Sequence, residues 1–474
     1  MTATDGERPV LTFEQDTIAA IATPPGEGAI GVVRISGPRA HAVADALFRP
    51  LHGSRPLSDT PWRLRHGRVV DAAGQVIDEV MAVVMPAPRT YTGEPMAEIH
   101  GHGGLAVSRA ILRTVLEAGA RPAGPGEFTR RAFLNGRMDL TRAEAVIDLI
   151  EARTEAALRA ALTMAGGTLR RALDAISDRV ADLLARAEAA VDFPEEDLPE
   201  MITPAWFEEV RVTREQMVQH LDAYRAGRLF REGATIVIAG RPNAGKSTLF
   251  NRLLDEERAI VTDIPGTTRD VLEGWTAFEG IAARLLDTAG LRDTVEPVER
   301  EGVTRARSAL EQADLVLWVL DLTLPVALLR KEWDQARNTL RDRVIGVGNK
   351  ADVVPDLPEP RADLPGLIPI SARGGMGLDV LRGEIGKRLH ALAGGRSPDE
   401  PMLSHEHQAE SLRRAIAAMS GALAQDSGTG YPGPQPELLA FELREALRAL
   451  GEITGDTTPD DLLDRIFSRF CIGK

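Results

Sequence analysis

The sequence has little of three things: cysteine, long apolar runs and positive charge. Its single cysteine, Cys471, excludes an internal disulfide and favours a reducing compartment. No apolar run approaches the roughly 20 residues that span a bilayer. The polar, acidic start, Met-Thr-Ala-Thr-Asp-Gly-Glu-Arg, is unlike a signal or transit peptide. We therefore expect a cytoplasmic protein that does not associate with membranes.

The formal net charge of −14 argues against indiscriminate binding of nucleic acid, because counterion release requires a cationic surface. A local basic surface is compatible with that net charge. Arginines cluster at Arg130, Arg131, Arg137 and Arg142. A solvated helix face with neighbouring acids explains this cluster equally well, so both interpretations stay open.

A chain of 474 residues suggests about three domains. Short β-branched runs, broken by turns and by an expected helix at 105–116, indicate an α+β domain at the start. Apolar residues at helical spacing over 141–226 and again after 405 indicate two helical segments, which we expect to pack together around an inserted domain. The predicted fold is multidomain α+β: an N-terminal α+β domain at 1–130, helical segments at 131–230 and 393–474, and an α/β P-loop domain at 231–392.

The stretch Gly240-Arg-Pro-Asn-Ala-Gly-Lys246-Ser247 directly follows the β-branched run 235–239. A strand followed by G-x-x-x-x-G-K-[ST] is the sequence form of a P-loop. In such a loop the backbone N–H groups surround phosphates, Lys246 contacts the β and γ oxygens, and the Ser247 hydroxyl binds Mg²⁺. The sequence therefore predicts a nucleoside triphosphate site.

Three further motifs follow in order, and they indicate GTP rather than ATP. Asp287-Thr-Ala-Gly290 comes after an expected strand and suits a carboxylate near the metal and a Gly amide facing the γ-phosphate. Asn349-Lys-Ala-Asp352 follows an apolar strand expected at 344–348, and Asp352 is able to accept both hydrogens from the N1 and N2 edge of guanine. Ser371-Ala-Arg373 supports the base from its O6 side. The full predicted nucleotide set is Asn243, Ala244, Gly245, Lys246, Ser247, Thr248, Thr262, Thr268, Asp287, Thr288, Ala289, Gly290, Asn349, Lys350, Asp352, Ser371, Ala372 and Arg373.

Leu291 stands where Ras-like GTPases carry the glutamine that orients the attacking water. An aliphatic side chain cannot orient water, so charge stabilisation and water orientation must come from other groups. One candidate is Asn243, whose side-chain oxygen is able to bind a monovalent cation such as K⁺ beside the phosphates. The other is the acidic segment 293–299. The loop 262–268 offers carbonyl groups to the cation, and Thr268 is placed to reach Mg²⁺.

Landmarks spread along the whole chain resemble the MnmE (TrmE) family of tRNA-modification GTPases. They combine the nucleotide motifs with sequences that generic GTPases lack. They are Asp16-Thr-Ile-Ala-Ala, Gly31-Val-Val-Arg-Ile-Ser-Gly37, Tyr91-Thr-Gly-Glu94, Gly101-His-Gly-Gly104, Pro125-Gly-Glu-Phe-Thr129, Arg131-Ala-Phe-Leu-Asn135, Asp192-Phe-Pro-Glu-Glu196, Asp263-Ile-Pro-Gly-Thr-Thr-Arg-Asp270 and Phe470-Cys-Ile-Gly-Lys474.

The resemblance implies a homodimer formed through a folate-binding N-terminal domain, a discontinuous helical domain and an inserted Ras-like GTPase domain activated by K⁺. It implies that Asn243, Thr262, Ile264 and Thr267 hold K⁺, that Lys246 and Glu299 are catalytic, and that Glu299 positions the attacking water. It also implies that Arg34, Glu98, Arg137 and Lys474 contact a 5-formyl- or methylene-tetrahydrofolate. Arg137 stands where a lysine is expected, which keeps the charge but replaces a point charge with a planar fork. Taken alone, Arg34 and Glu98 are equally explained as ordinary surface or ion-paired residues.

By the same resemblance, the protein works with an FAD-dependent partner, MnmG. Together they install an aminomethyl or carboxymethylaminomethyl group at C5 of the wobble uridine of certain tRNAs. Two other functions are open on the sequence: a ribosome-assembly GTPase switch without modification chemistry, and a scaffold whose hydrolysis is vestigial. The N-terminal landmarks weigh against the first. The intact Lys246, Ser247, Thr268 and Asp287 weigh against the second.

Three explanations are open for Cys471. Its distance from the end matches a prenylation motif, but the terminal residues fit one poorly and no polybasic tract precedes it. A buried structural thiol is the second explanation. The resemblance implies the third, a functional thiol near the folate, and reactivity would then require a lowered pKa.

Overall fold

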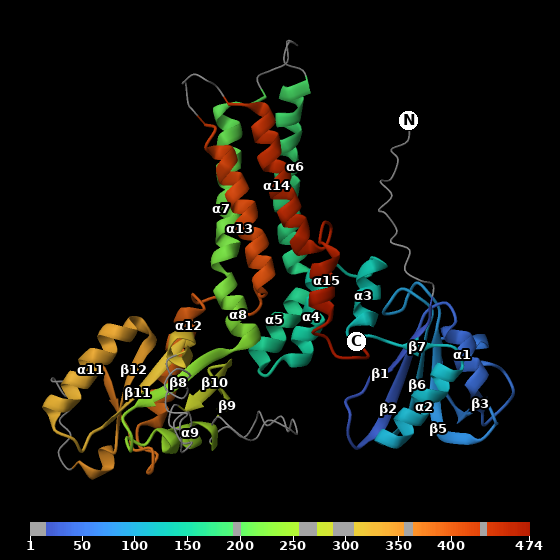
Figure 1. The fold of residues 1–474 in the computed structure, drawn as a ribbon, viewed down its shortest axis with the longest axis horizontal. Coiled ribbons are helices and arrows are strands. Elements are labelled where there is room, and N and C mark those ends of the chain that lie inside the picture. The colour runs from blue at the N-terminus through green and yellow to red at the C-terminus, as the bar shows by residue number, and fades with distance from the viewer. Residues whose placement is uncertain (1–15, 193–200, 256–272, 288–307, 355–363, 427–433) are drawn as a thin grey trace, which may run out of the picture. The chain divides into compact units, whose positions relative to one another are not determined.

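A computed structural model describes residues 16–192, 201–255, 273–287, 308–354, 364–426 and 434–474 (Figure 1). The described chain divides into two compact units. The first combines the N-terminal part, up to Ile147, with the C-terminal residues Thr454–Lys474, and the second is Asp148–Ile453. The two ends of the chain therefore belong to one unit.

The first unit is built on a seven-stranded sheet with the order β3-β4-β5-β6-β2-β1-β7. Neighbouring strands are antiparallel except for β1 and β7, which run parallel. The strands are β1 (Ile18–Ile21), β2 (Gly28–Ser36), β3 (Phe48–Pro50), β4 (Arg65–Val70), β5 (Val76–Met85), β6 (Met96–Gly103) and β7 (Arg121–Pro122).

The sheet of this unit has a hydrophobic cluster on each face, because successive side chains of a strand point to opposite faces. On β1, Ala19 packs with α1 (Ala40–Leu47) and α2 (Leu105–Glu117). Its neighbours Ile18 and Ala20 join Met96 and the fully buried Phe128 of α3 (Glu127–Leu134) on the other face. The expected helix at 105–116 is thereby confirmed.

The C-terminal residues complete the first unit. Helix α15 (Asp460–Phe467) contributes Leu463, Ile466 and Phe467 to a cluster with Leu140 and Ala143 of α4 (Leu140–Glu151). The chain passes from the first unit into the second within α4.

The second unit contains a six-stranded sheet with the order β13-β12-β11-β8-β10-β9, parallel except for the antiparallel β9 at one edge. This is the sheet of the P-loop domain. Its strands are β8 (Ala234–Gly240), β9 (Glu273–Phe278), β10 (Ile281–Asp287), β11 (Leu315–Asp321), β12 (Val344–Asn349) and β13 (Leu367–Pro369).

Both faces of that sheet are covered by helices, which explains the near-continuous apolar runs of its strands. Ile236 and Ile238 of β8 pack with α9 (Lys246–Asp255) and α12 (Leu378–Leu392). The intervening Val237 and Ala239 pack with α11 (Val326–Leu340). Short 3₁₀ turns occur at Leu57–Asp59, Arg341–Arg343 and Ala351–Val353.

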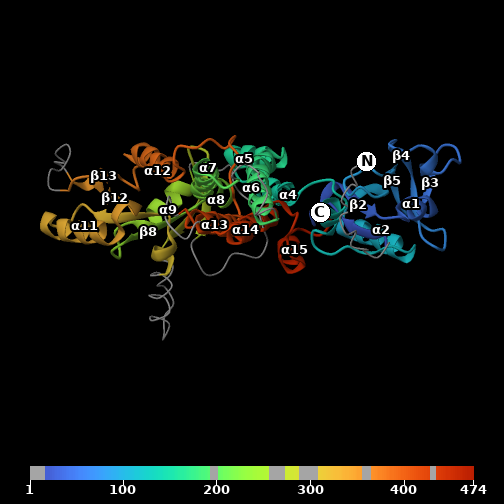
Figure 2. The ribbon, with the colours of Figure 1, turned by 90° about the horizontal axis from the view of Figure 1, so that it is seen from above.

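Four long helices lie side by side in the second unit: α6 (Thr168–Asp192), α7 (Pro204–Asp222), α13 (Glu406–Leu423) and α14 (Pro436–Thr454) (Figures 1 and 2). Two precede the P-loop domain in the sequence and two follow it. Polar contacts join them: Arg214 Nε donates to Ser420 Oγ at 2.7 Å, and Arg444 pairs with Glu188. The shorter α5 (Glu155–Ala165) and α8 (Tyr224–Glu232) complete the helical part.

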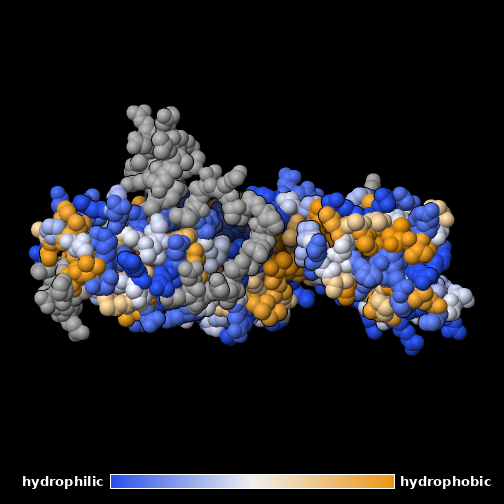
Figure 3. Space-filling model, turned by 90° about the horizontal axis from the view of Figure 1, so that it is seen from below, coloured by the Kyte–Doolittle hydropathy of each residue, from blue (hydrophilic) through white to orange (hydrophobic). Residues whose placement is uncertain are grey.

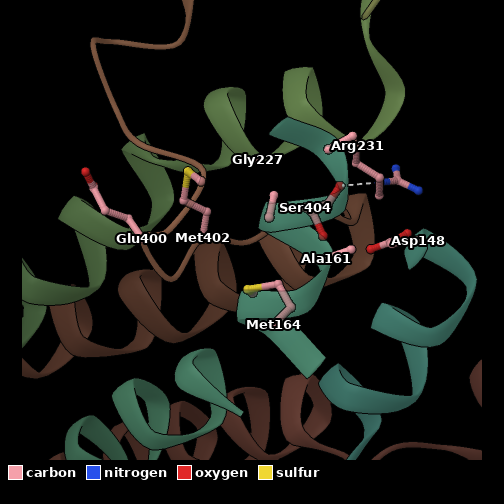
Figure 4. Close-up of a pocket in the computed structure, with 10 residues that line it drawn as sticks. Asp148, Ala161, Met164, Gly227, Arg231, Glu400, Met402 and Ser404 are labelled. Carbon is pink, nitrogen blue, oxygen red and sulfur yellow. Dashed lines mark hydrogen bonds between the residues drawn. The ribbon is translucent and has the colours of Figure 1, made fainter. Parts of the chain in front are cut away.

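The segment between α12 and α13 is held against α8 and α5 around a small cavity of about 20 Å³ (Figure 4). Arg231 Nε donates to Ser404 O at 3.0 Å, and the buried pair His405 and Asp148 lies 3.2 Å apart. Gly227 is essential to this packing, because a Cβ there would lie 2.1 Å from Leu403 O.

The surface mixes polar and apolar side chains, and Figure 3 shows apolar groups scattered over a largely hydrophilic face. Exposed large hydrophobic residues include Trp62, Leu162 and Phe441. Within the described ranges, no helix combines the length and the apolar character needed to cross a membrane.

Candidate nucleotide and C-terminal sites

The P-loop turns between β8 and α9, and its glycines are required by close approach as well as by backbone angle. A Cβ on Gly240 would lie 2.2 Å from Val319 O, and one on Gly245 would lie 2.1 Å from Asn349 Nδ2. Both have positive φ, at 142° and 95°. The loop therefore packs directly on the ends of β11 and β12, and α9 begins at Lys246 with its N-terminus available to an anion.

Lys246, Ser247 and Asp287 come together as the motif spacing predicts. Lys246 Nζ donates to Arg241 O at 2.9 Å, and Ser247 Oγ donates to Asp287 Oδ2 at 2.6 Å. Asp287 is fully buried at the end of β10. A buried carboxylate beside a hydroxyl is a donor set that fits Mg²⁺, which prefers oxygen ligands.

Asn349 joins the P-loop to the segment expected to support the base. Its Nδ2 donates to Ala244 O at 2.8 Å, and its Oδ1 accepts from Ala372 N at 2.9 Å. Ser371, next to Ala372, is buried, and its Oγ accepts from Gly374 N. These contacts bring the motifs 349–352 and 371–373 beside the P-loop.

The remaining described members of the predicted nucleotide set lie at the rim. Lys350 has a left-handed backbone (φ 66°) and its Nζ lies 2.6 Å from Asp321 Oδ2. Asp352, Thr248 and Arg373 are exposed. Asn243 is exposed in the P-loop with φ 63°. The predicted residues Thr262, Ile264, Thr267, Thr268, Thr288, Ala289, Gly290, Leu291 and Glu299 lie outside the described residues.

The C-terminal residues 471–474 lie against the N-terminal sheet of the first unit. Gly126 N donates to Cys471 O at 3.4 Å, and Phe128 N donates to Lys474 O at 3.2 Å. Ile472 forms an isolated bridge with Pro125. A Cβ on Gly473 would lie 2.5 Å from Ile21 O, so this position requires glycine (φ 97°).

Three of the residues predicted for folate meet at this C-terminal segment. Arg34 Nε lies 3.0 Å from Glu98 Oε1, and Arg34 Nη1 donates to Gly473 O at 3.3 Å. Burial and the charge of Arg34 lower the pKa of the Lys474 ammonium. Arg34, Glu98 and Lys474 therefore form one charged cluster, in which Arg34 and Glu98 are ion-paired, as one of the two interpretations expected.

His100 belongs to the same cluster, and sequence reasoning missed it. Its Nε2 lies 3.1 Å from Glu98 Oε2. This hydrogen bond and the charge of Arg34 lower the pKa of the Glu98 carboxyl against the opposing effect of burial. The available signal was the period of β6, because residues i and i+2 of a strand share a face.

Arg137 and Cys471 are more exposed than Arg34 and Glu98. Arg137 is exposed, and its Nε donates to Thr90 O at 3.1 Å. Among the described residues, no hydrogen bond joins Arg137 to Arg34, Glu98 or Lys474. Cys471 is an exposed free thiol, so the interpretation as a buried structural cysteine is wrong.

In the arginine cluster that begins at Arg130, Arg131 fits neither a basic surface for nucleic acid nor a solvated helix face. Arg131 is 8% exposed and pairs with Asp16, Glu94 and Glu127. Three carboxylates around one guanidinium leave Arg131 no free charge for nucleic acid, and its burial excludes a solvated face. Arg130 pairs with Asp464.

Comparison with known proteins decides the family. Residues 140–471 match the MnmE helical domain, and residues 17–137 match the N-terminus of the GTP-binding protein TrmE. The chain belongs to the MnmE family. This confirms the resemblance found in the sequence landmarks.

Members of the MnmE family match this chain from end to end. A protein of Symbiobacterium thermophilum named tRNA modification GTPase MnmE is 46% identical over 466 residues, which cover 97% of this chain and all of the relative. A protein of the same name from Geobacter sulfurreducens is 44% identical, over 98% of this chain and all of the relative. Among solved structures, the G domain of the T. maritima FeoB iron transporter is 26% identical and covers 34% of this chain and 98% of that chain, with a TM-score of 0.25.

Proposed function

We propose that this chain is an enzyme of tRNA modification that binds and hydrolyses GTP. The observation that carries the proposal is Asn349, which ties Ala244 of the P-loop to Ala372 of the base-supporting segment. Phosphate binding and base recognition are thereby built as one site. The names of the curated relatives, which cover the whole chain, point to the same activity.

Guanine selectivity is assigned to Asp352. It follows Asn349 and Lys350 in the turn Ala351–Val353, and its side chain is exposed rather than committed to a core contact. A carboxylate accepts hydrogen bonds from both N1–H and N2–H of guanine, whereas adenine offers no matching pair of donors. Lys350 is held at this edge by Asp321.

Hydrolysis is assigned to residues on both sides of the phosphate site. Lys246 supplies positive charge to the β and γ oxygens, and Ser247 with Asp287 holds Mg²⁺ directly or through water. We further propose that Asn243 holds K⁺ together with Thr262, Ile264 and Thr267, that Thr268 completes the Mg²⁺ site, and that Glu299 orients the attacking water. The support for these additional roles is membership of the family, together with the exposed position of Asn243 in the P-loop.

The C-terminal cluster is assigned to a tetrahydrofolate derivative. Arg34 and Lys474 offer positive charge, Glu98 offers a carboxylate acceptor, and Arg137 adds a second guanidinium. We propose that Cys471 acts there in the modification of C5 of the wobble uridine, with an FAD-dependent partner, MnmG. A folate-binding fold of the first unit, a homodimer formed through it, insertion of the P-loop domain between two helical segments and a cytoplasmic location belong to the same proposal.

The cation dependence of hydrolysis tests the catalytic part. Purified protein should hydrolyse GTP faster in KCl than in NaCl at equal ionic strength, because a cage built for K⁺ holds the smaller Na⁺ poorly. Asn243→Ala should remove most of that difference, whereas Asp379→Asn, at an exposed residue outside the predicted nucleotide set, should keep it. Equal rates in both salts for the wild type would contradict the K⁺ assignment and leave GTP binding intact.

A further inference from the structure

Arg241, the second residue of the P-loop, forms an ion pair with a helix outside the loop. Its Nε lies 2.8 Å from Glu332 Oε2 on α11. The arginine side chain is 50% exposed, but the glutamate is 10% exposed. Nothing in the nucleotide motifs points to Glu332.

Whereas the side chain of Arg241 pairs with α11, its backbone contacts Lys246. Its carbonyl oxygen accepts from Lys246 Nζ at 2.9 Å and from Ala244 N at 3.4 Å. This carbonyl therefore contributes to the position of the lysine ammonium. A displacement of Arg241 moves the group that contacts the phosphates.

Helix α11 provides a fixed support for the ion pair. Leu329, Trp333 and Ala336 of this helix are buried against β8 and β11. Glu332 and Arg241 line a cavity of about 500 Å³ together with Lys331, Gln335 and Trp318. Lys331 is the other cation in that lining, and no ion pair between Lys331 and Glu332 occurs in the described part of the chain.

We propose that Glu332 is a positioning residue for GTP binding and hydrolysis, which acts on Lys246 through Arg241. The inference rests on the proposed function. An ion pair between fully exposed groups contributes little, but a carboxylate that is mostly buried loses hydration and depends on its partner. Glu332 thus fixes Arg241, and Arg241 fixes Lys246.

A double-mutant cycle tests the proposal. Glu332→Gln and Arg241→Gln are each expected to raise the Kd for GTP and to lower kcat/KM by about 10-fold, within the range measured for contacting pairs. The double variant is expected to lose about as much as either single variant, because both remove the same contact. The preference for GTP over XTP should stay unchanged, since Asp352 is untouched.

Glu384→Gln is the matched control, because Glu384 pairs with Arg388 on the same domain at 3.0 Å and is 34% exposed. It should leave GTP binding and hydrolysis at the wild-type values. Thermal unfolding is measured for every variant, and Arg241→Gln, which changes an exposed side chain, keeps the test available if Glu332→Gln does not fold.

The proposal is overturned if Glu332→Gln folds and keeps wild-type affinity and rate, or if the losses of the two single variants add in the double variant. If Arg241→Gln alone is measurable, wild-type affinity and rate in that variant overturn it. A wild-type protein that neither binds nor hydrolyses GTP contradicts the proposed function itself, so the two failures are distinguishable in one assay.

Discussion

At the scale of single residues, the nucleotide site is a set of side chains that each hold a backbone segment in place. Asn349 holds two loops, Ser247 meets a buried carboxylate, and Lys246 rests on a loop carbonyl. Asp352 is different, because it is exposed and free of any core packing. Its contribution should therefore appear in ligand choice and not in stability.

Asp352→Asn is expected to weaken GTP binding by roughly 10- to 100-fold, the cost of losing charged hydrogen bonds. The same change should strengthen XTP binding, because the 2-oxo group of xanthine accepts from the new amide. Equilibrium binding of both nucleotides checks this. Asp379→Asn, another exposed aspartate of the domain, serves as the control, and a variant that keeps full GTP affinity and gains nothing for XTP refutes the assignment.

Glu299→Ala is expected to slow hydrolysis by roughly 100-fold or more with GTP affinity near normal, because a group that orients water acts mainly in the transition state. Leu291→Ala should cost much less. Single-turnover rates and equilibrium binding separate the two effects. Small and equal losses in both variants would place the water-orienting group elsewhere.

Sequence reasoning predicted the P-loop residues from a spacing that one strand, one turn and one helix fix, and the structure has β8 and α9 on either side of that turn. It did not find Glu332 or His100. Glu332 pairs with Arg241, which is distant in the chain. His100 pairs with Glu98, two positions earlier on the same strand. The pair of Glu332 depends on the packing of α11, which no local pattern indicates, whereas the pair of His100 follows from the alternation of side chains along β6.

At the scale of helices and strands, α8 closely approaches the segment before α13. Gly227 of α8 faces Leu403 O, and Leu403 is fully buried (Figure 4). Arg231, one turn later on α8, donates to Ser404 O. This segment connects α12, the last helix of the P-loop domain, with α13, the first helix of the second helical segment. Its packing against α8 therefore holds the P-loop domain to the helical part.

Gly227→Ala is expected to destabilise the protein by about 1–3 kcal/mol, since the new methyl group overpacks against a backbone carbonyl. Gly383→Ala is the control: Gly383 lies inside α12 and a Cβ there meets nothing within 4 Å. That variant should gain up to about 1 kcal/mol from helix propensity. Thermal unfolding of both variants checks the pair, and equal midpoints would contradict the close approach.

The strands and helices themselves were largely predictable. The expected strands at 235–239 and 344–348 appear as β8 (Ala234–Gly240) and β12 (Val344–Asn349). Continuous apolar runs between turn residues were sufficient to place them. The path of β3 and β4 was not predictable, because it depends on tertiary contacts and not on composition. The docking of residues 471–474 beside the N-terminal sheet was implied by the family resemblance and not by any pattern in the residues.

At the scale of the whole molecule, the two proposed chemistries belong to different units. The nucleotide residues lie in Asp148–Ile453, whereas Arg34, Glu98, Cys471 and Lys474 lie in the unit that joins both ends of the chain. The sequence predicted the C-terminal residues as part of a helical segment and, by resemblance, as part of a folate site. The structure places them on the N-terminal sheet.

Cys471→Ser is therefore expected to leave GTP hydrolysis at the wild-type rate and to abolish or strongly reduce modification of the wobble uridine. The thiol is exposed, so the change should not disturb folding. Hydrolysis assays and nucleoside analysis of tRNA measure the two activities separately. Full modification by this variant would remove the cysteine from the chemistry.

We propose that GTP hydrolysis by this chain drives tRNA modification. Mass analysis of tRNA nucleosides from a deletion strain, complemented with wild type or with Lys246→Ala, tests it most directly. The C5 substituent of the wobble uridine should be missing in the deletion strain, restored by the wild type and not restored by Lys246→Ala. An unchanged substituent in the deletion strain, or full restoration by Lys246→Ala, would contradict it.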